Sequence, residues 1–108
     1  MLELDQKYVF HVPLYKFEDN ELIAIDMDDL LDDLICRFNQ GGFHSLYVSK
    51  VKSIYESRCF DELTITIFTE SGQAPDIIFM EWFRKNNHVL RQEALAYERN
   101  DVMIIESL

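Results

Sequence analysis

Hydrophobic and polar residues alternate along the first patterned segment of the chain. Between Tyr8 and Tyr15 the apolar residues on one side of this alternation are Tyr8, Phe10, Val12 and Leu14. A period of two is typical of a strand with one buried face. Pro13 has no amide proton to donate, so the strand is predicted to lie at a sheet edge there or to end nearby. The polar segment 16–21 is predicted to be a connection.

Helical periodicity follows, and it forms the best-marked element of the chain. Apolar residues recur at helical spacing and make one stripe: Met27, Leu30, Leu31, Leu34, Ile35 and Phe38. Asp26 is the predicted N-cap, because its side chain is of the type that accepts hydrogen bonds from a first helical turn. Gly41 and Gly42 are predicted to end the helix, because glycine adopts the left-handed conformation at little cost.

A hairpin is predicted over residues 43–69. The apolar side changes parity near Ser49-Lys50, which indicates either a bulge or a twisted, partly exposed strand. Residues 56–61 are the predicted turn, and the alternation around Ile65 is typical of a return strand.

A second helix and a second hairpin complete the pattern. Pro75 is well placed to begin the helix. Two further strands, 93–98 and 102–106, flank a predicted turn at 99–101, where Asn and Asp favour turn geometry.

The predicted order of strand, helix, hairpin, helix, hairpin favours an α+β fold. We expect a mostly antiparallel sheet with two helices packed on one face. The β-α-β-β-α-β(β) order is similar to the ferredoxin-like arrangement in element order only, so it implies no functional residues. A chain of 108 residues is predicted to form a single domain, residues 1–108.

The net charge of the chain limits the classes of partner that we expect. The chain has 20 acidic and 10 basic residues, a net charge of −10. Such a field repels nucleic-acid phosphates and anionic lipids, so we expect no direct nucleic-acid binding and a basic protein partner or self-association instead. No apolar run reaches the roughly eighteen residues of a membrane span, and the first residues do not form a signal peptide. Cys36 and Cys59 are predicted to be free thiols, Cys36 buried, which favours a cytoplasmic location.

No familiar catalytic motif is present. The sequence has no G-x-S-x-G, H-E-x-x-H, C-x-x-C or Gly-rich phosphate loop. The histidines, His11, His44 and His88, fall on different predicted elements, and we interpret them as ordinary surface or half-buried residues rather than metal ligands. No cofactor, metal or catalytic residue is predicted.

One polar group is a candidate ligand site: Tyr55, Arg58, Glu62 and Glu93. If the first hairpin and the last strand pair lie together, Arg58 meets Glu93 or Glu62. An arginine–carboxylate pair beside a tyrosine can orient a small polar ligand. A salt bridge that closes a turn is the favoured alternative.

The acidic run in the first helix is a candidate docking surface: Asp28, Asp29, Asp32 and Asp33. Like-charge pairs four residues apart cost about 0.2–0.5 kcal/mol each. Two carboxylates in the first turn recover about 0.3–1 kcal/mol each from the helix dipole. Because these terms nearly offset, a solvated helix face is the default, with docking of a basic partner or weak divalent-cation binding as the hypothesis.

If the second face of the sheet is uncovered, we expect an apolar patch there, formed by Tyr47, Val51, Tyr55 and Phe68. Such patches mark dimer interfaces. The leading functional prediction is therefore a non-enzymatic protein-interaction or oligomerisation domain. The alternatives are a small ligand-binding domain or enzyme that uses the polar group around Arg58, and an acidic nucleic-acid mimic that inhibits a DNA-binding protein.

Overall fold

Five antiparallel strands form the main sheet of the computed structural model, which describes residues 1–108. Their order across the sheet is β4-β5-β1-β6-β7. The bounds are β1 Gln6–Pro13, β4 Leu46–Tyr55, β5 Arg58–Thr69, β6 Ala94–Arg99 and β7 Val102–Ser107. Two further strands, β2 (Tyr15–Glu18) and β3 (Glu21–Ala24), pair only with each other.

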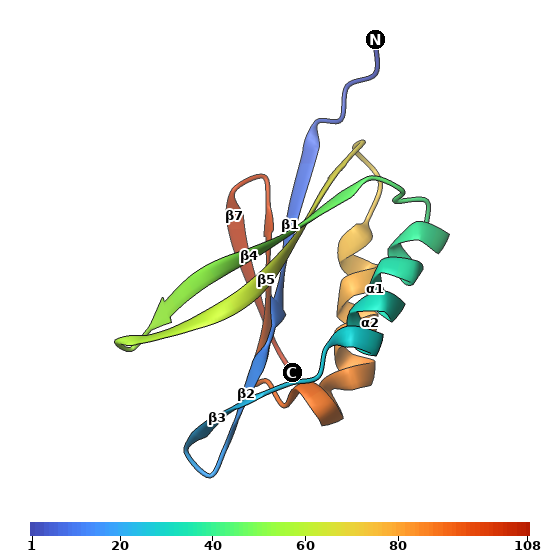
Figure 1. Ribbon diagram of the computed structural model, residues 1–108. Helices are drawn as coiled ribbons and strands as arrows, with labels where there is room; N and C mark the ends of the chain where they lie inside the picture. The colour runs from blue at the N-terminus through green and yellow to red at the C-terminus, as the bar shows by residue number, and fades with distance from the viewer.

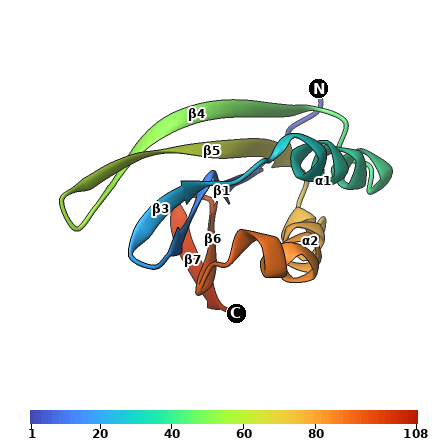
Figure 2. The ribbon, with the colours of Figure 1, turned by 60° about the horizontal axis from the view of Figure 1, so that its bottom comes forward.

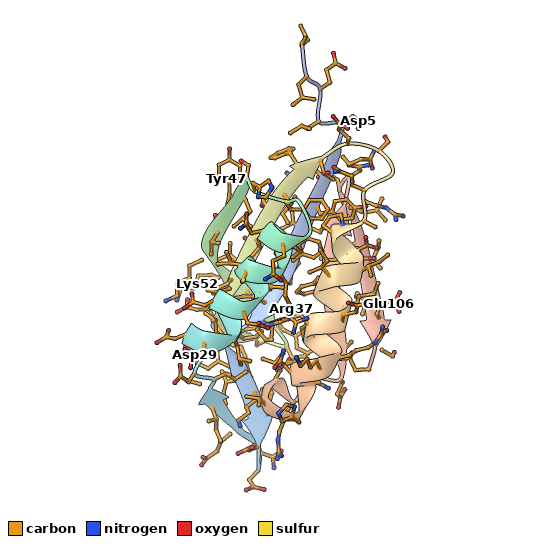
Figure 3. All side chains as sticks on the ribbon, turned by 90° about the vertical axis from the view of Figure 1, so that its right-hand side faces the viewer. Asp5, Asp29, Arg37, Tyr47, Lys52 and Glu106 are labelled. Atoms are coloured by element: carbon orange, nitrogen blue, oxygen red, sulfur yellow. The ribbon has the colours of Figure 1, made fainter.

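Two helices, α1 (Asp28–Gln40) and α2 (Pro75–Leu90), lie side by side on one face of the main sheet (Figures 1 and 3). No helix covers the other face, which we call the open face (Figure 1). The predicted α+β class, with a mostly antiparallel sheet and both helices on one side, is confirmed. Neither helix is long and apolar enough to cross a membrane.

The hydrophobic core lies between the helices and the sheet and is built mainly of aromatic rings. Phe10 of β1 is fully buried, and its ring centroid lies 4.7 Å from Phe79 and 5.3 Å from Phe38. Trp82 of α2 is also fully buried, and its Nε1 donates a hydrogen bond to the Leu30 carbonyl oxygen at 3.1 Å. These contacts connect both helices to each other and to the sheet.

The β2–β3 hairpin corrects the prediction of a polar connection at residues 16–21. Asp19 and Asn20 occupy the turn with φ of 51° and 62°, the backbone that a two-residue hairpin turn requires. Asp and Asn tolerate this region, so the charged residues that suggested a loop in fact close a hairpin. Because this hairpin precedes α1, the ferredoxin-like order is not confirmed.

Two local details of the sequence-based expectation also change. The residue that precedes α1 is Met27, whose side chain is buried; Asp26, the predicted cap, accepts a bond from the Asp28 backbone amide at 3.3 Å.

Strands β4 and β5 pair without interruption from Leu46↔Ile67 to Tyr55↔Arg58, so there is no bulge. The parity change instead reflects an outer hairpin that extends beyond the helices and is exposed on both faces (Figure 2).

The β4–β5 turn offers a test of this backbone geometry. Glu56 and Ser57 have φ of 49° and 65°, yet neither is glycine. We expect Ser57→Gly to raise the free energy of unfolding by about 0.5 kcal/mol, since relief of left-handed strain exceeds the entropic cost of glycine. Urea denaturation measures this change. Ser53→Gly, within extended β4, should lower the free energy by about 0.5–1 kcal/mol.

Candidate functional site

The predicted polar group is only partly brought together. Tyr55 and Arg58 are paired at the exposed tip of the β4–β5 hairpin, while Glu62 lies four residues further along β5. The Arg58 guanidinium lies 5.2 Å from the centre of the Phe17 ring and forms an ion pair with neither Glu62 nor Glu93. Glu93 is exposed just before β6. The arginine–carboxylate pair considered from the sequence is therefore not formed.

Glu62 instead belongs to a cluster around His11 on the open face. His11 Nδ1 lies 2.5 Å from Glu62 Oε1, and His11 Nε2 lies 2.8 Å from Glu98 Oε2. The residues come from β5, β1 and β6, which are neighbours in the sheet. Their side chains are 22% (His11), 19% (Glu62) and 31% (Glu98) exposed, so water screens the cluster only in part. We call these three residues the His11 cluster.

The hydrogen bonds of the His11 cluster define the charge of its imidazole. A neutral imidazole has one N–H, so it donates to only one of two carboxylates; an imidazolium donates to both. The hydrogen bond with Glu62 is the largest cause that raises the pKa of His11, and the bond with Glu98 also raises it, against the opposing effect of burial. These hydrogen bonds therefore favour the imidazolium, and an imidazolium with two carboxylates has a net charge of −1.

Two adjoining hollows of about 170 and 240 Å³ lie between the β2–β3 hairpin and β5. Phe17 and Phe60 line both, Glu62 lines the first, and Tyr55 and Arg58 line the second. We call the two hollows the hairpin pocket. Figure 2 shows the β2–β3 hairpin beneath the outer part of the β4–β5 hairpin. Three of the four residues of the predicted ligand site thus line these two hollows, Glu62 the first and Tyr55 and Arg58 the second, and Glu93 lines neither.

Two carboxylates of the hairpin pocket have no lysine partner: Glu62 in the first hollow and Glu56 in the second. Asp61 also lines the pocket, but Lys52 Nζ lies 2.8 Å and Lys50 Nζ 3.4 Å from its carboxylate oxygens. The hydrogen bond from Lys52 is the main cause that lowers the pKa of Asp61. Glu56 is exposed at the hairpin turn, whereas the side chain of Glu62 is 19% exposed, so a cationic ligand in the first hollow would meet the less screened negative charge at Glu62.

The other hollows differ in their lining: one of about 550 Å³ beside α1 includes Asp32 and His44, and one of about 300 Å³ includes Glu70 and His44. One of about 320 Å³ near the start of β4 is lined by Leu2, Leu4, Ser45, Tyr47 and Phe68. It has no charged side chain. All four residues of the predicted apolar patch are exposed. The homodimer suggested by that patch stays a prediction.

The acidic helix face is solvent-exposed as expected. Asp28, Asp29, Asp32 and Asp33 are all exposed, and Figure 3 shows Asp29 near the start of α1. Asp33 accepts a hydrogen bond from Arg37 Nε at 2.9 Å, which neutralises one of the four charges. Docking of a basic partner on this face stays a prediction.

The cysteines and histidines are dispersed over the fold. Cys36 and Cys59 are free, as predicted, but Cys36 is exposed rather than buried, because it faces away from the Leu34–Phe38 stripe. His44 contacts Asn39, and His88 contacts the Lys85 carbonyl oxygen at 3.1 Å. The three histidines do not converge, and no group of acidic, His or Cys side chains has metal-binding geometry.

Sequence reasoning did not assign His11 or Glu98 to a site. Alternation along β1 places His11 opposite the buried Phe10 and Val12, and alternation along β6 places Glu98 opposite Tyr97. These positions predict the open face for both residues. The missing information was the strand order, because β1 and β6 are separated by more than 80 residues in the sequence.

No protein-family model matches the chain, and no curated protein matches it. Its fold, however, is found in solved structures of an α+β enzyme class, the S-adenosylmethionine (SAM) lyases. A phage SAM lyase in the apo state superposes with a TM-score of 0.58 at 12% identity, covering 100% of this chain and 95% of that chain. A phage SAM lyase in complex with S-methyl-5′-thioadenosine superposes with a TM-score of 0.57 at 11% identity, covering 95% of this chain and 89% of that one. The similarity at this identity is one of fold.

This comparison corrects the leading prediction of a non-enzymatic interaction or oligomerisation domain. The solved structures that share the fold over nearly the whole chain are enzymes, and one holds a small molecule. The fold therefore favours the alternative of a ligand-binding domain or enzyme. Motif searches find chemistry that has a local signature, whereas side chains gathered from several strands leave none.

Proposed function

We propose that this chain binds SAM and cleaves it to S-methyl-5′-thioadenosine, as a lyase. The observation that carries the proposal is the full-length similarity of fold to phage SAM lyase. The proposed binding site is the hairpin pocket.

The chemistry of the hairpin pocket matches the parts of SAM. Phe17 and Phe60 offer ring faces for the adenine, and Arg58 offers a guanidinium for the amino-acid carboxylate. Glu62 offers a negative charge for the sulfonium or the ammonium group. The two hollows together fall in the lower part of the range of about 300–1,000 Å³ for small-molecule sites.

The proposed reaction makes few demands on acid–base groups. When the carbon–sulfur bond to the aminobutyryl chain breaks, both electrons stay on sulfur and the sulfonium becomes a neutral thioether. The leaving group therefore needs no proton donor, which fits a chain without a recognisable catalytic motif. The four-carbon fragment leaves as a lactone if its own carboxylate oxygen attacks the carbon bonded to sulfur as the carbon–sulfur bond breaks, or as an alkene if a carboxylate of the pocket or water takes up a proton from the neighbouring carbon. Mass spectrometry distinguishes these products.

Incubation of the purified protein with SAM tests the proposal, with S-methyl-5′-thioadenosine measured by liquid chromatography and mass spectrometry. We expect the product to form well above the spontaneous breakdown in buffer. Arg58→Gln and Glu62→Gln should each reduce kcat/KM by about tenfold or more, because each removes a charged contact with the ligand.

Glu81→Gln is the matched control, since Glu81 is exposed on α2 and lies outside the hairpin pocket. Glu93→Gln in the same assay tests the remaining residue of the predicted group. No product above the buffer rate, together with no SAM binding by calorimetry, would refute the proposed function. Binding without cleavage would leave a SAM-binding protein and refute the lyase.

A further inference from the structure

The His11 cluster shares one residue with the hairpin pocket. Glu62 Oε1 is held by His11, whereas Glu62 Oε2 forms no hydrogen bond or ion pair within the chain. The side chain of Glu62 also lines the hollow beside Phe17 and Phe60. One oxygen of the Glu62 carboxylate therefore contacts the His11 ring, and the other is available to a ligand in the pocket.

We propose that the His11 cluster selects the cationic substrate over the neutral product, and that the His11 proton and the ligand's positive charge compete for Glu62. This inference rests on the proposed function, since it names the specificity-determining residues of that site. One further positive charge neutralises a cluster of net charge −1. A sulfonium or ammonium group supplies that charge, and the neutral thioether sulfur of the product does not.

Other charged groups do not mask this competition. On the open face, Lys7 of β1 lies diagonally across from Glu98, on the other side of Val9 from His11. The remaining residues that strand alternation and strand pairing place beside the cluster are uncharged. They are Val9 and Pro13 from β1, Thr64 and Thr66 from β5, Ser49 and Val51 from β4, and Met103 and Ile105 from β7. The charged groups that face His11 are thus Glu62 of β5 and Glu98 of β6. Proton and ligand are linked through these carboxylates.

The link between the His11 proton and SAM binding predicts the direction in which affinity changes with pH. A positive charge bound at Glu62 repels the imidazolium, so it lowers the pKa of His11, and by reciprocity deprotonated His11 binds the cation more tightly. We expect the affinity for SAM to rise about three- to tenfold from about pH 6 to about pH 9. The affinity for S-methyl-5′-thioadenosine should change less than about twofold over that range, because it carries no charge.

Calorimetry with SAM and S-methyl-5′-thioadenosine measures the selectivity in wild type, Glu62→Gln and His11→Gln. Glu62→Gln should lose about tenfold in affinity for SAM and little for the neutral product. His11→Gln should lose the rise in SAM affinity with pH and keep only the dependence that comes from SAM's own amino group, whereas the control His88→Gln, changed at an exposed α2 residue, should keep the wild-type profile. Equal pH dependence for both ligands in wild type would overturn the inference.

A second measurement separates this inference from the proposed function. NMR follows the His11 ring during a pH titration, with trimethylsulfonium chloride as the probe and sodium chloride at equal ionic strength as the reference. We expect the probe to lower the pKa of His11 in wild type and to leave it unchanged in Glu62→Gln. That result without SAM turnover would refute only the lyase. SAM turnover, together with a pKa of His11 that does not change when the probe is added, would refute only the proposed competition between the His11 proton and the ligand for Glu62.

Discussion

Replacement of Phe10 by alanine is expected to lower the free energy of unfolding by about 3–5 kcal/mol, the largest effect of any substitution proposed for this chain. Phe10 is completely buried on β1, at the centre of the sheet. Its ring lies 4.7 Å from Phe79 of α2, 5.3 Å from Phe38 of α1 and 5.7 Å from Tyr97 of β6. The substitution therefore opens a cavity bordered by both helices and the sheet.

Urea denaturation followed by circular dichroism measures this loss. Phe68→Ala is the matched control, because Phe68 is 43% exposed on the open face and its removal opens no enclosed cavity. We expect a loss of less than about 1 kcal/mol for the control. Similar losses for the two variants would show that the core is not centred between the helices and the sheet. A small domain is stable by about 5–15 kcal/mol, so Phe10→Ala should retain a measurable unfolding transition unless the wild type lies at the lower end of that range.

The sequence predicted the elements that have one buried face. Alternation around Phe10 and Ile65 marked β1 and β5, and the 3.6-residue stripe through Leu34 and Phe38 marked α1. All four side chains are fully buried in the core. Burial on one face imposes a period on the sequence, and a period is readable without knowledge of the partner element.

Elements without a buried face were harder to predict. The β2–β3 hairpin has intermediate and exposed residues only, so its sequence has no apolar stripe of the kind that marked β1. The outer part of β4 is exposed on both sides, and its apolar residues change parity without a bulge. The hairpin pocket lies between these two hairpins, which explains why the sequence suggested Arg58 and Glu62 but not Phe17 or Phe60.

The His11 cluster was unpredictable for a different reason. Each of its residues occupies an ordinary outward-facing strand position, and the charged pairing arises only from the order β5-β1-β6. Strand order depends on contacts between residues far apart in the sequence, which periodicity does not report. The candidate ligand residues near Arg58 were proposed from their polar side chains and from an assumed contact between the first hairpin and the last strand pair. The hydrogen bond between His11 and Glu62 could be identified only from the fold.

Replacement of His11 by leucine is expected to lower the free energy of unfolding by about 1–2 kcal/mol near pH 6, a value reduced from that of a fully buried pair because water reaches part of the cluster. The leucine removes the imidazolium that bridges Glu62 and Glu98, so two partly buried carboxylates are left without a cation between them. His88→Leu, on the exposed face of α2, removes a histidine without a carboxylate partner and is the control.

The difference in the free energy of unfolding between wild type and His11→Leu should depend on pH if the imidazolium causes it. The pKa of His11 is raised in the folded protein, so its stabilisation is fully present below the unfolded value of about 6.5 and is lost as the pH rises through the folded value. The difference between wild type and His11→Leu should therefore be greatest below about pH 6.5 and decline as the pH rises through the folded pKa of His11. A difference that stays constant from acid to alkaline pH would show that His11 stabilises the sheet by packing, and would remove the charge on which the proposed substrate selectivity depends.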